Sequence, residues 1–327
     1  MPRKRPGKKA PKSKKRIPGP LCAAVMLRGP LMERGKRMNA TWRRKLTPYL
    51  LILPNVLIYF IFIFVPLLCV IYLSFTNYSI LSPGHWVGLS NYERMLEDQL
   101  FMGAVKNTFV FWIVSVLPQM ALGLVLAVLL NSKIKGLSFF RAGLYLPSVI
   151  SGVAVSMTWL YLYDFQSGPF NAVLKGLHLN PVNWLGDAQY ALMSISILGI
   201  WVGTGYALIV YLAGLQSISQ ELYEAASIDG ASKLRIFFRI TVPLLNPMTF
   251  FIFVTATIRS FQVFDYVYVM TKGGPLNATN TIVNSIVDTS FAQYEMGYAS
   301  ALSIFLLVIT LVITLINYRV GTKTLDS

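Results

Sequence analysis

The chain has 327 residues, a formal net charge of +16 at pH 7 and only 13% charged residues, about half the share usual in soluble proteins. Apolar residues make up 55% of the chain and gather in runs too long for a soluble core. These properties exclude a soluble globular protein and indicate a chain embedded in lipid.

Most of the positive charge lies in an N-terminal tail. Residues 1–45 hold 16 of the 29 Lys and Arg side chains against the single acid Glu33, and the remaining residues hold 13 basic and 12 acidic side chains. We expect this segment to be a disordered cytoplasmic tail attracted to anionic lipid. The first 41 residues contain no aromatic side chain, which argues against specific nucleic-acid binding. Three methionines leave open a later translation start: Met26, Met32 and Met38.

Residues 46–320 are predicted to form one all-α transmembrane domain with six spans. A helix needs about 20 predominantly apolar residues to cross the hydrocarbon core. Six stretches meet this requirement, at about 48–74, 105–131, 140–163, 190–214, 246–268 and 297–318. Since lipid offers no partners for backbone N–H and C=O groups, each stretch is expected to be helical.

Lys and Arg residues predict the orientation, because cytoplasmic loops carry an excess of them. With the N-terminus in the cytoplasm, the cytoplasmic segments after the tail hold Lys133, Lys135, Arg141, Lys233, Arg235, Arg239, Arg319 and Lys323. The external loops hold Arg94, Lys106, Lys175 and Lys272. Both chain ends are therefore expected in the cytoplasm.

The cytoplasmic segment 219–243 carries the clearest signal. Ser219 is placed to cap a first short helix, Gly230 to break it, and Ser232 to cap a second helix that ends at Pro243. Two short helices joined at a glycine would form a compact elbow at the membrane surface.

Nine positions of this elbow form a specific pattern: Glu224, Ala225, Ala226, Asp229, Gly230, Ala231, Phe237, Ile240 and Pro243. The pattern closely resembles the EAA loop of binding-protein-dependent ABC importers, although Val242 stands where that family usually has Leu. The resemblance implies that these residues couple the chain to an ATP-hydrolysing subunit. The loop would dock in a groove on that subunit, with the two alanines allowing close helix approach and Glu224 pairing with a basic side chain.

Other segments resemble the sugar-permease branch of that family, which includes maltose, lactose and glycerol-phosphate permeases. They are residues 87–92, 146–149 with Trp159, 168–171, and 264–275 with Thr281. The resemblance covers about residues 47–320 and implies the type I ABC importer permease fold. The implied function is import of a sugar or oligosaccharide by alternating access. Unlike the maltose-type subunit, this chain has no large insertion in its second external loop.

The resemblance also implies an assembly in the bacterial inner membrane. This multi-pass chain would pair with a second, distinct permease subunit, two ATP-binding subunits and an external solute-binding protein, surrounded by membrane lipid. It would hold no cofactor of its own, since ATP and Mg²⁺ would bind the partner ATPase.

Polar and aromatic side chains in the later spans are candidates for contact with the solute: Trp201, Tyr206, Arg259, Gln262, Asp265 and Asn284. Arg259 and Asp265 are six residues apart, about 120° around a helix, so no direct pair is predicted. A structural role at a helix end remains an alternative for Asp265, as packing or interfacial roles do for Trp201, Tyr206, Gln262 and Asn284. Gly199 and Gly203 are expected to serve close helix packing.

Three other functional classes are an enzyme, a secondary transporter and a passive scaffold. The sequence has no Gly-x4-Gly-Lys-Ser/Thr phosphate loop and no His/Cys cluster, so neither catalytic residues nor a metal site are predicted. A secondary transporter remains an alternative, but it would favour charged coupling residues at the midplane and would not need an ATPase-docking elbow. The same elbow distinguishes an importer from a passive scaffold, which would not need to bind an ATPase. Glycerol phosphate or another polar solute remains an alternative cargo.

Overall fold

The computed structural model describes residues 47–131 and 136–325, with side chains described as far as Arg319. The chain divides into two units, with the boundary between Leu67 and Leu68. The expected tail over residues 1–45, the cations Lys133 and Lys135, and the side chain of Lys323 lie outside the described residues.

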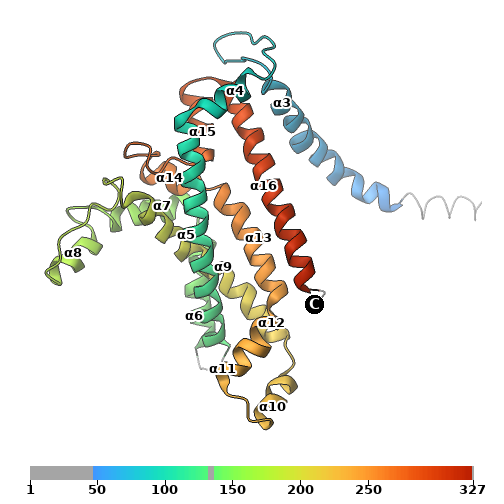
Figure 1. Cartoon of the computed structure of the whole chain (residues 1–327), viewed down its shortest axis with the longest axis vertical. Helices are drawn as coiled ribbons and strands as arrows, with labels where there is room; N and C mark the ends of the chain where they lie inside the picture. Colours follow the sequence, from blue (N-terminus) through green and yellow to red (C-terminus); the bar gives the residue numbers. More distant parts are fainter. Residues whose placement is uncertain (1–46, 132–135, 326–327) are drawn as a thin grey trace, which may run out of the picture. The chain divides into compact units, whose positions relative to one another are not determined.

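The described chain is helical, as the sequence predicts (Figure 1). Its described residues contain no β-strand, only isolated bridges that join Thr76 to Trp86 and Ser79 to Ser82. The first helix, Thr47–Leu73, includes the π turn η1 (Phe60–Phe64) and α3 (Val65–Leu73). The later elements are α4 (Ser90–Glu97), α5 (Gln99–Leu130), α6 (Leu137–Tyr145), η2 (Leu146–Ser148), α7 (Gly152–Leu162), α8 (Pro169–Gly176), α9 (Ala191–Ser217), α10 (Gln220–Ile228), α11 (Lys233–Ile236), η3 (Phe237–Thr241), α12 (Val242–Leu244), α13 (Asn246–Phe261), α14 (Asp265–Met270), α15 (Ile282–Val287), η4 (Asp288–Ala292) and α16 (Met296–Leu325).

Four described helices are individually long and apolar enough to cross a membrane: Thr47–Leu73, Gln99–Leu130, Ala191–Ser217 and Met296–Arg319. Two bent pairs also qualify, Leu137–Ser148 with Gly152–Leu162 and Lys233–Leu244 with Asn246–Phe261. The described chain therefore has four to six candidate spans, and the six predicted from the sequence are the upper bound.

The second span begins before its predicted start at residue 105. Asp98 caps α5, because its side-chain Oδ1 accepts hydrogen bonds from the backbone N–H groups of Leu100 at 2.9 Å and Phe101 at 3.1 Å. An Asp at this position satisfies N–H groups that have no partner inside the helix. The cap extends the helix outward to Gln99.

The structure differs from the continuous helix predicted over residues 140–163. α6 ends at Tyr145, the 3₁₀ turn η2 contains Pro147, and α7 begins at Gly152 after a bend of 96°. Proline cannot donate the hydrogen bond that would continue the helix. The end of α6 packs closely on α9, where a Cβ atom added to Gly205 would meet the carbonyl oxygen of Leu144.

The predicted fifth span, residues 246–268, is also interrupted. α13 ends at Phe261, and Asp265 begins a separate helix, α14. The carbonyl of the buried Val263 in the break accepts a hydrogen bond from the Thr281 hydroxyl at 3.2 Å. A break at membrane depth is tolerated where neighbouring groups satisfy the freed backbone in this way.

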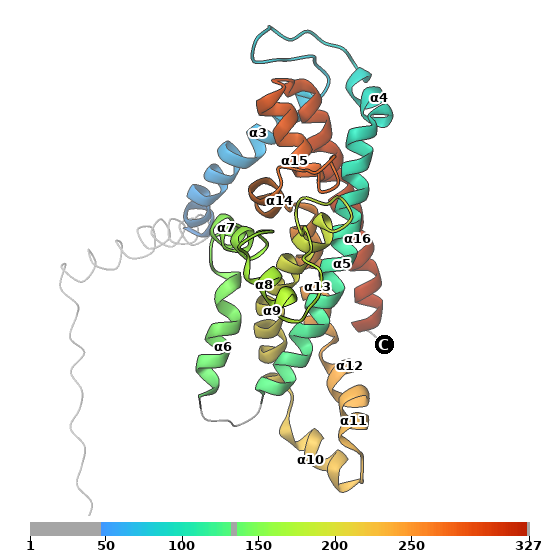
Figure 2. The ribbon, with the colours of Figure 1, turned by 90° about the vertical axis from the view of Figure 1, so that its left-hand side faces the viewer.

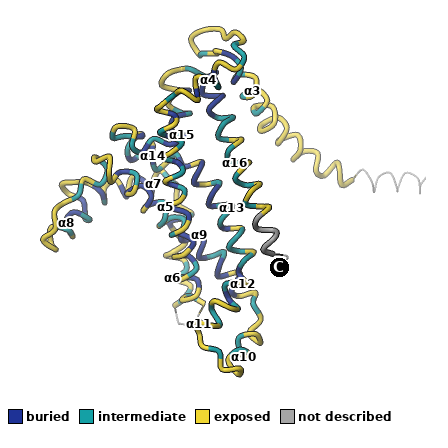
Figure 3. Tube along the Cα trace, in the orientation of Figure 1, coloured by how far each residue is buried: buried dark blue, intermediate teal, exposed yellow. Residues whose placement is uncertain are grey.

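Within residues 68–327, the packing centres on α9, which lies against α5 and α13 (Figure 3). The buried residues of this core are Val116, Met120, Ala127, Ala207, Tyr211, Leu212, Leu215, Leu245, Ile252 and Ala256. Lipid tails are as apolar as these side chains, so helices in a membrane associate through close packing of small residues. A Cβ atom added to Gly123 of α5 would lie 2.5 Å from the Cβ of Ala207 on α9.

Valine in place of Gly123 is therefore expected to destabilise the protein by about 1–3 kcal/mol, because the added methyl groups force α5 and α9 apart. Thermal unfolding of the purified protein in detergent measures the effect. Gly103→Val is the matched control on the same helix, since a Cβ at Gly103 meets no atom within 4 Å. Equal unfolding temperatures for the two variants would contradict the packing argument.

Candidate functional site

The segment 219–243 forms the expected elbow, and its first arm is α10. The Ser219 side chain accepts a hydrogen bond from the Glu221 N–H at 3.3 Å, as its predicted capping role requires. Gln220 Nε2 donates to Glu224 Oε1 at 2.8 Å. Gly230 follows the arm with a φ of +74°, a left-handed conformation that side chains disfavour, and it turns the chain into the second arm.

The second arm is made of α11, η3 and α12. Ser232 caps it as predicted, accepting from the Arg235 N–H at 3.4 Å. The arm does not end at Pro243 as predicted, because α12 continues to Leu244 and the bend of 62° follows at that point. The π turn η3 ends at Thr241, two residues before Pro243, and a π turn and a proline are both recognised causes of a local bend.

The elbow is tied to the core at the base of the second arm. Tyr223 and Thr241 join the two arms through hydroxyl oxygens 3.3 Å apart. The N–H of Leu245 donates to the carbonyl of the buried Thr241 at 3.0 Å, and Leu245 is itself buried in the core. A Cβ atom added to Gly214 near the end of α9 would lie 2.8 Å from Leu245. Movement of the elbow would therefore be passed to both α9 and α13.

The outer surface of the elbow is exposed and partly apolar. No residue of α10 is buried, and the exposed fractions are 86% for Ile228, 71% for Leu234 and 64% for Phe238. Figures 1 and 2 show α10 and α11 at the opposite end of α5, α9 and α13 from α4 and α15. This end presents large apolar side chains beside charged ones, as a docking surface does.

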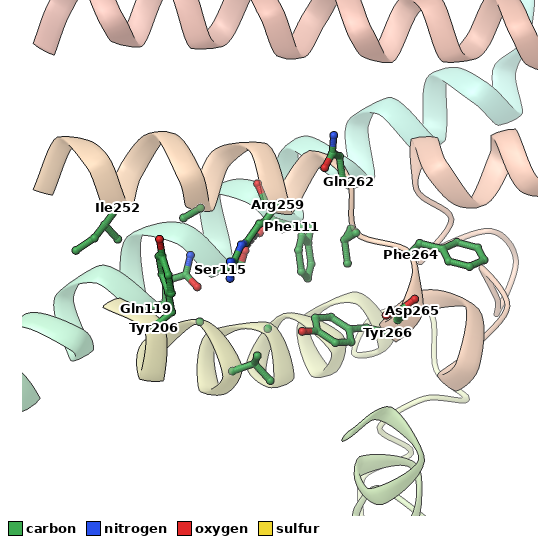
Figure 4. Close-up of a pocket in the computed structure, with 16 residues that line it drawn as sticks. Phe111, Ser115, Gln119, Tyr206, Ile252, Arg259, Gln262, Phe264, Asp265 and Tyr266 are labelled. Atoms are coloured by element: carbon green, nitrogen blue, oxygen red, sulfur yellow. Dashed lines mark hydrogen bonds between the residues drawn. The ribbon is translucent and has the colours of Figure 1, made fainter. Parts of the chain in front are cut away.

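A cavity of about 260 Å³ lies between α5, α9, α13 and the break before α14 (Figure 4). Its volume is just below the range of about 300–1,000 Å³ typical of small-molecule sites. The lining residues are Phe111, Ser115, Gln119, Gly199, Val202, Gly203, Tyr206, Ile252, Ala256, Arg259, Ser260, Gln262, Val263, Phe264, Asp265 and Tyr266.

Arg259 provides the positive charge of this cavity. Its guanidinium carbon lies 4.5 Å from the centre of the Tyr206 ring on α9, in cation–π geometry. Figure 4 shows Arg259 extending from α13 toward α5 and α9, beside Ser115 and Gln119. The Gln119 side chain is only 8% exposed, and its Oε1 occupies the space that a Cβ at Gly203 would fill.

Asp265 provides the negative charge at the other end of the cavity. It begins α14 and lies against Gly152, the first residue of α7, where an added Cβ would meet its carboxylate. Ser151, the N-cap residue of α7, makes no side-chain capping hydrogen bond. The Asp265 carboxylate therefore faces the positive end of the α7 dipole.

Four of the six predicted solute-contact residues line this cavity: Tyr206, Arg259, Gln262 and Asp265. Trp201 lies on the opposite side of α9 and packs against Trp159, with ring centroids 5.6 Å apart. Asn284 is buried in α15 and donates to Asn280 Oδ1 at 2.8 Å. Gly199 and Gly203 face α5, consistent with the predicted helix packing, and they also form part of the cavity wall.

Sequence reasoning missed several lining residues, above all Gln119, Ser115 and Tyr266. Gln119 is a polar side chain in the middle of the apolar α5 helix, next to Pro118. Polar residues inside a membrane helix usually face the interior of the bundle or a cavity, so this position carried a usable signal. Tyr266 carried none, because its position depends on the break that precedes α14.

A second cavity, of about 650 Å³, lies at the opposite end from the elbow and is lined by residues of α4, α5, α15, η4 and α16. No predicted solute-contact residue lines it. Arg94 pairs with Glu295 at 2.7 Å and lies 4.1 Å from the Tyr298 ring centre, while Tyr298 donates to Asp98 at 2.8 Å. These contacts join α4 and the start of α5 to the last helix.

Residues 108–325 match the family described as the binding-protein-dependent transport system inner membrane component. The chain belongs to this family. The chain is similar to the probable ABC transporter permease protein YurN of Bacillus subtilis (strain 168), to which it is 34% identical over 282 residues, 85% of this chain and 96% of YurN. The trehalose/maltose transport system permease protein MalF of Thermococcus litoralis is 35% identical over 291 residues, 89% of this chain and 98% of MalF.

A solved structure with the same fold is that of a bacterial ABC transporter involved in the import of the acidic polysaccharide alginate. It aligns with a TM-score of 0.78 and 25% sequence identity over 88% of this chain and 99% of that chain. A second structure, with an alginate pentasaccharide-bound periplasmic protein, gives the same TM-score. The predicted membership of the sugar-permease branch is confirmed, and the relatives are transport components rather than enzymes.

The contact between Arg259 and Tyr206 is expected to contribute about 0.5–1 kcal/mol to stability. A double-mutant cycle with Tyr206→Leu and Arg259→Gln, read by chemical unfolding in detergent, measures this coupling. Tyr206→Phe is the control, because it keeps the ring face and should keep the coupling. Strictly additive effects of the leucine and glutamine changes would show that the two side chains do not interact.

Proposed function

We propose that this chain is the transmembrane permease subunit of an ATP-driven importer. It passes a carbohydrate from an external binding protein into the cytoplasm by alternating access, and a separate ATPase drives the cycle. The observation that carries this proposal is the exposed elbow over residues 219–243, which presents the nine-residue pattern at one end of the helices.

The elbow suits the coupling of ATP hydrolysis to movement of the cavity walls. Its first arm leads back to α9, which carries Tyr206, and its second arm leads into α13, which carries Arg259. Because Leu245 and Thr241 fix the base of the second arm to the core, rotation of a docked ATPase would move these two walls together. The joint displacement of these walls sets the access of solute to the cavity.

The proposed topology has six spans with both ends of the chain in the cytoplasm. The bent pair α6–η2 and α7 then serves as one span, and Asn246–Phe261 is the membrane part of the other bent pair. The elbow, the end of α5 and the start of α6 share the cytoplasmic end. The excess of Lys and Arg in the predicted cytoplasmic segments supports this orientation. The location is the bacterial inner membrane.

The proposed assembly contains a second permease subunit, two ATP-binding subunits and an external solute-binding protein. ATP and Mg²⁺ bind the ATPase, and this chain contributes the coupling surface. The alginate transporter supports the external partner, since it was solved with a periplasmic protein that holds the saccharide. Carbohydrate cargo is supported by the trehalose/maltose permease and the alginate importer among the similar proteins.

Disruption of the elbow should release the ATPase. Glu224→Arg reverses the charge of the docking arm, and Gly230→Val strains a backbone with φ +74°. We expect each variant to copurify with little of the ATPase subunit. We expect its rate of ATP-dependent uptake to be at least tenfold lower than that of the wild type.

Gly88→Val is the matched control for the glycine change. Gly88 also has a positive φ, of +62°, and it precedes α4, the helix that Figure 1 shows at the end opposite the elbow. If Glu224→Arg and Gly230→Val retained both the ATPase and uptake at the level of this control, the coupling role of the elbow would be refuted.

The topology is tested by labelling exposed lysine positions with a membrane-impermeant maleimide on intact cells. In a background with Cys22 and Cys69 changed to serine, Lys175→Cys on α8 should react and Lys233→Cys on the elbow should not. Both should react after the membrane is permeabilised. Reaction of Lys233→Cys in intact cells would reverse the proposed orientation.

A further inference from the structure

Arg259 is a charged side chain that the coupling mechanism does not use. Within residues 47–131 and 136–319, no carboxylate lies within ion-pair distance of its guanidinium, whereas Arg94 is paired with Glu295. Ionisable groups among membrane helices are costly and are usually paired or placed where they act on a solute or ion. The missing partner of Arg259 therefore needs an explanation.

Two features of the fold offset part of this charge. The face of the Tyr206 ring attracts the guanidinium, and the last turn of α13, where Arg259 lies, is the negative end of that helix. Neither supplies an anionic acceptor for the five N–H donors of an arginine. The planar guanidinium matches carboxylate and phosphate groups through two parallel hydrogen bonds.

Asp265 is not the partner of Arg259, although both line the cavity. Its carboxylate lies against Gly152 at the start of α7, and α7 and α14 pack on each other. The positive end of α7 thus compensates the charge of Asp265 within the protein. The end of α13 and the Tyr206 ring offset part of the Arg259 charge but give its guanidinium no anionic acceptor, so its N–H donors can bind an anion near α13.

The remaining polar groups suit a hydroxylated molecule. Gln119 and Ser115 lie beside Arg259, and the Tyr266 hydroxyl points into the space from the α14 side (Figure 4). Amide and hydroxyl groups both donate and accept hydrogen bonds, as sugar hydroxyls require. Phe111 adds an apolar face on which a sugar ring can lie.

We propose that the solute is a saccharide that carries a negative charge, and that Arg259 determines this specificity by binding its carboxylate or phosphate group. This inference rests on the proposed function as a carbohydrate permease and narrows the class of cargo. The similar transporter for an acidic polysaccharide is consistent with it, whereas the similar trehalose/maltose permease handles a neutral sugar.

The complete importer tests this proposal in proteoliposomes, assembled from this chain and the partner subunits and binding protein that copurify with it. ATP-dependent uptake is measured for two matched pairs of probes. Trigalacturonate and galactotriose compare a carboxylate with a neutral sugar, and glucose 6-phosphate and glucose compare a phosphate with a neutral sugar. We expect transport of the charged member of at least one pair in preference to its neutral partner, and the preferred pair identifies the anion.

Variants of Arg259 then separate recognition from structure. Arg259→Gln should lower kcat/KM for the anionic probe by about 10- to 100-fold, mainly through KM, because it removes charge-assisted hydrogen bonds. Arg259→Lys should recover part of this loss by restoring the charge. Lys106→Gln, which removes an exposed cation of α5 outside the cavity, should change uptake by less than twofold.

Two results would overturn the proposal. One is a wild-type importer that takes up only neutral sugars in an ATP-dependent manner, which would leave the proposed permease function intact. The other is an Arg259→Gln variant that transports the anionic probe as well as wild type does. Absence of all ATP-dependent uptake, with no ATPase bound to the elbow, would instead refute the proposed permease function on which this inference rests.

Discussion

The need to satisfy every backbone hydrogen bond inside lipid is the constraint on which the rest of this structure depends. It makes the apolar stretches helical. It allows a break only where neighbouring groups form hydrogen bonds with the freed backbone N–H and C=O groups. The break at residues 262–264 follows this rule, because the Val263 carbonyl is bonded to Thr281. The same break places residues 262–266 at one end of the cavity. An uninterrupted fifth helix would have no such cavity wall.

Two helices connect the functional parts of the molecule. α9 and α13 pack on each other and on α5, and both line the cavity. The elbow connects the end of α9 to the start of α13. The close approach of these helices depends on small residues, such as Gly123, Gly203 and Gly214, that leave no room for a side chain. Tight packing transmits displacement because packed elements shift between discrete arrangements rather than deforming smoothly. The elbow and the cavity are therefore parts of one mechanical unit.

Local signals in the sequence were sufficient to predict the two arms of the elbow and the turn between them. Its two serine caps and the left-handed glycine depend on residues within a few positions of each other, and the structure has all three where they were predicted. The breaks in the third and fifth spans were not predicted, because average hydropathy does not show where a helix bends. Pro147 could have indicated the first break. The second has no comparable residue, since its stabilising partner, Thr281, lies 18 positions away.

The sequence by itself determined that this chain is a helical membrane protein of the ABC importer family, because apolar run length and the elbow pattern are local properties. It also marked Tyr206, Arg259, Gln262 and Asp265 as polar groups inside apolar stretches. Only the tertiary structure decided that these four share a cavity with Gln119, and that Trp201 and Asn284 do not. Only the tertiary structure set Asp265 against the start of α7 and left Arg259 without a carboxylate partner among the described residues. Such neighbours are set by the packing of helices distant in the chain, which no local pattern encodes.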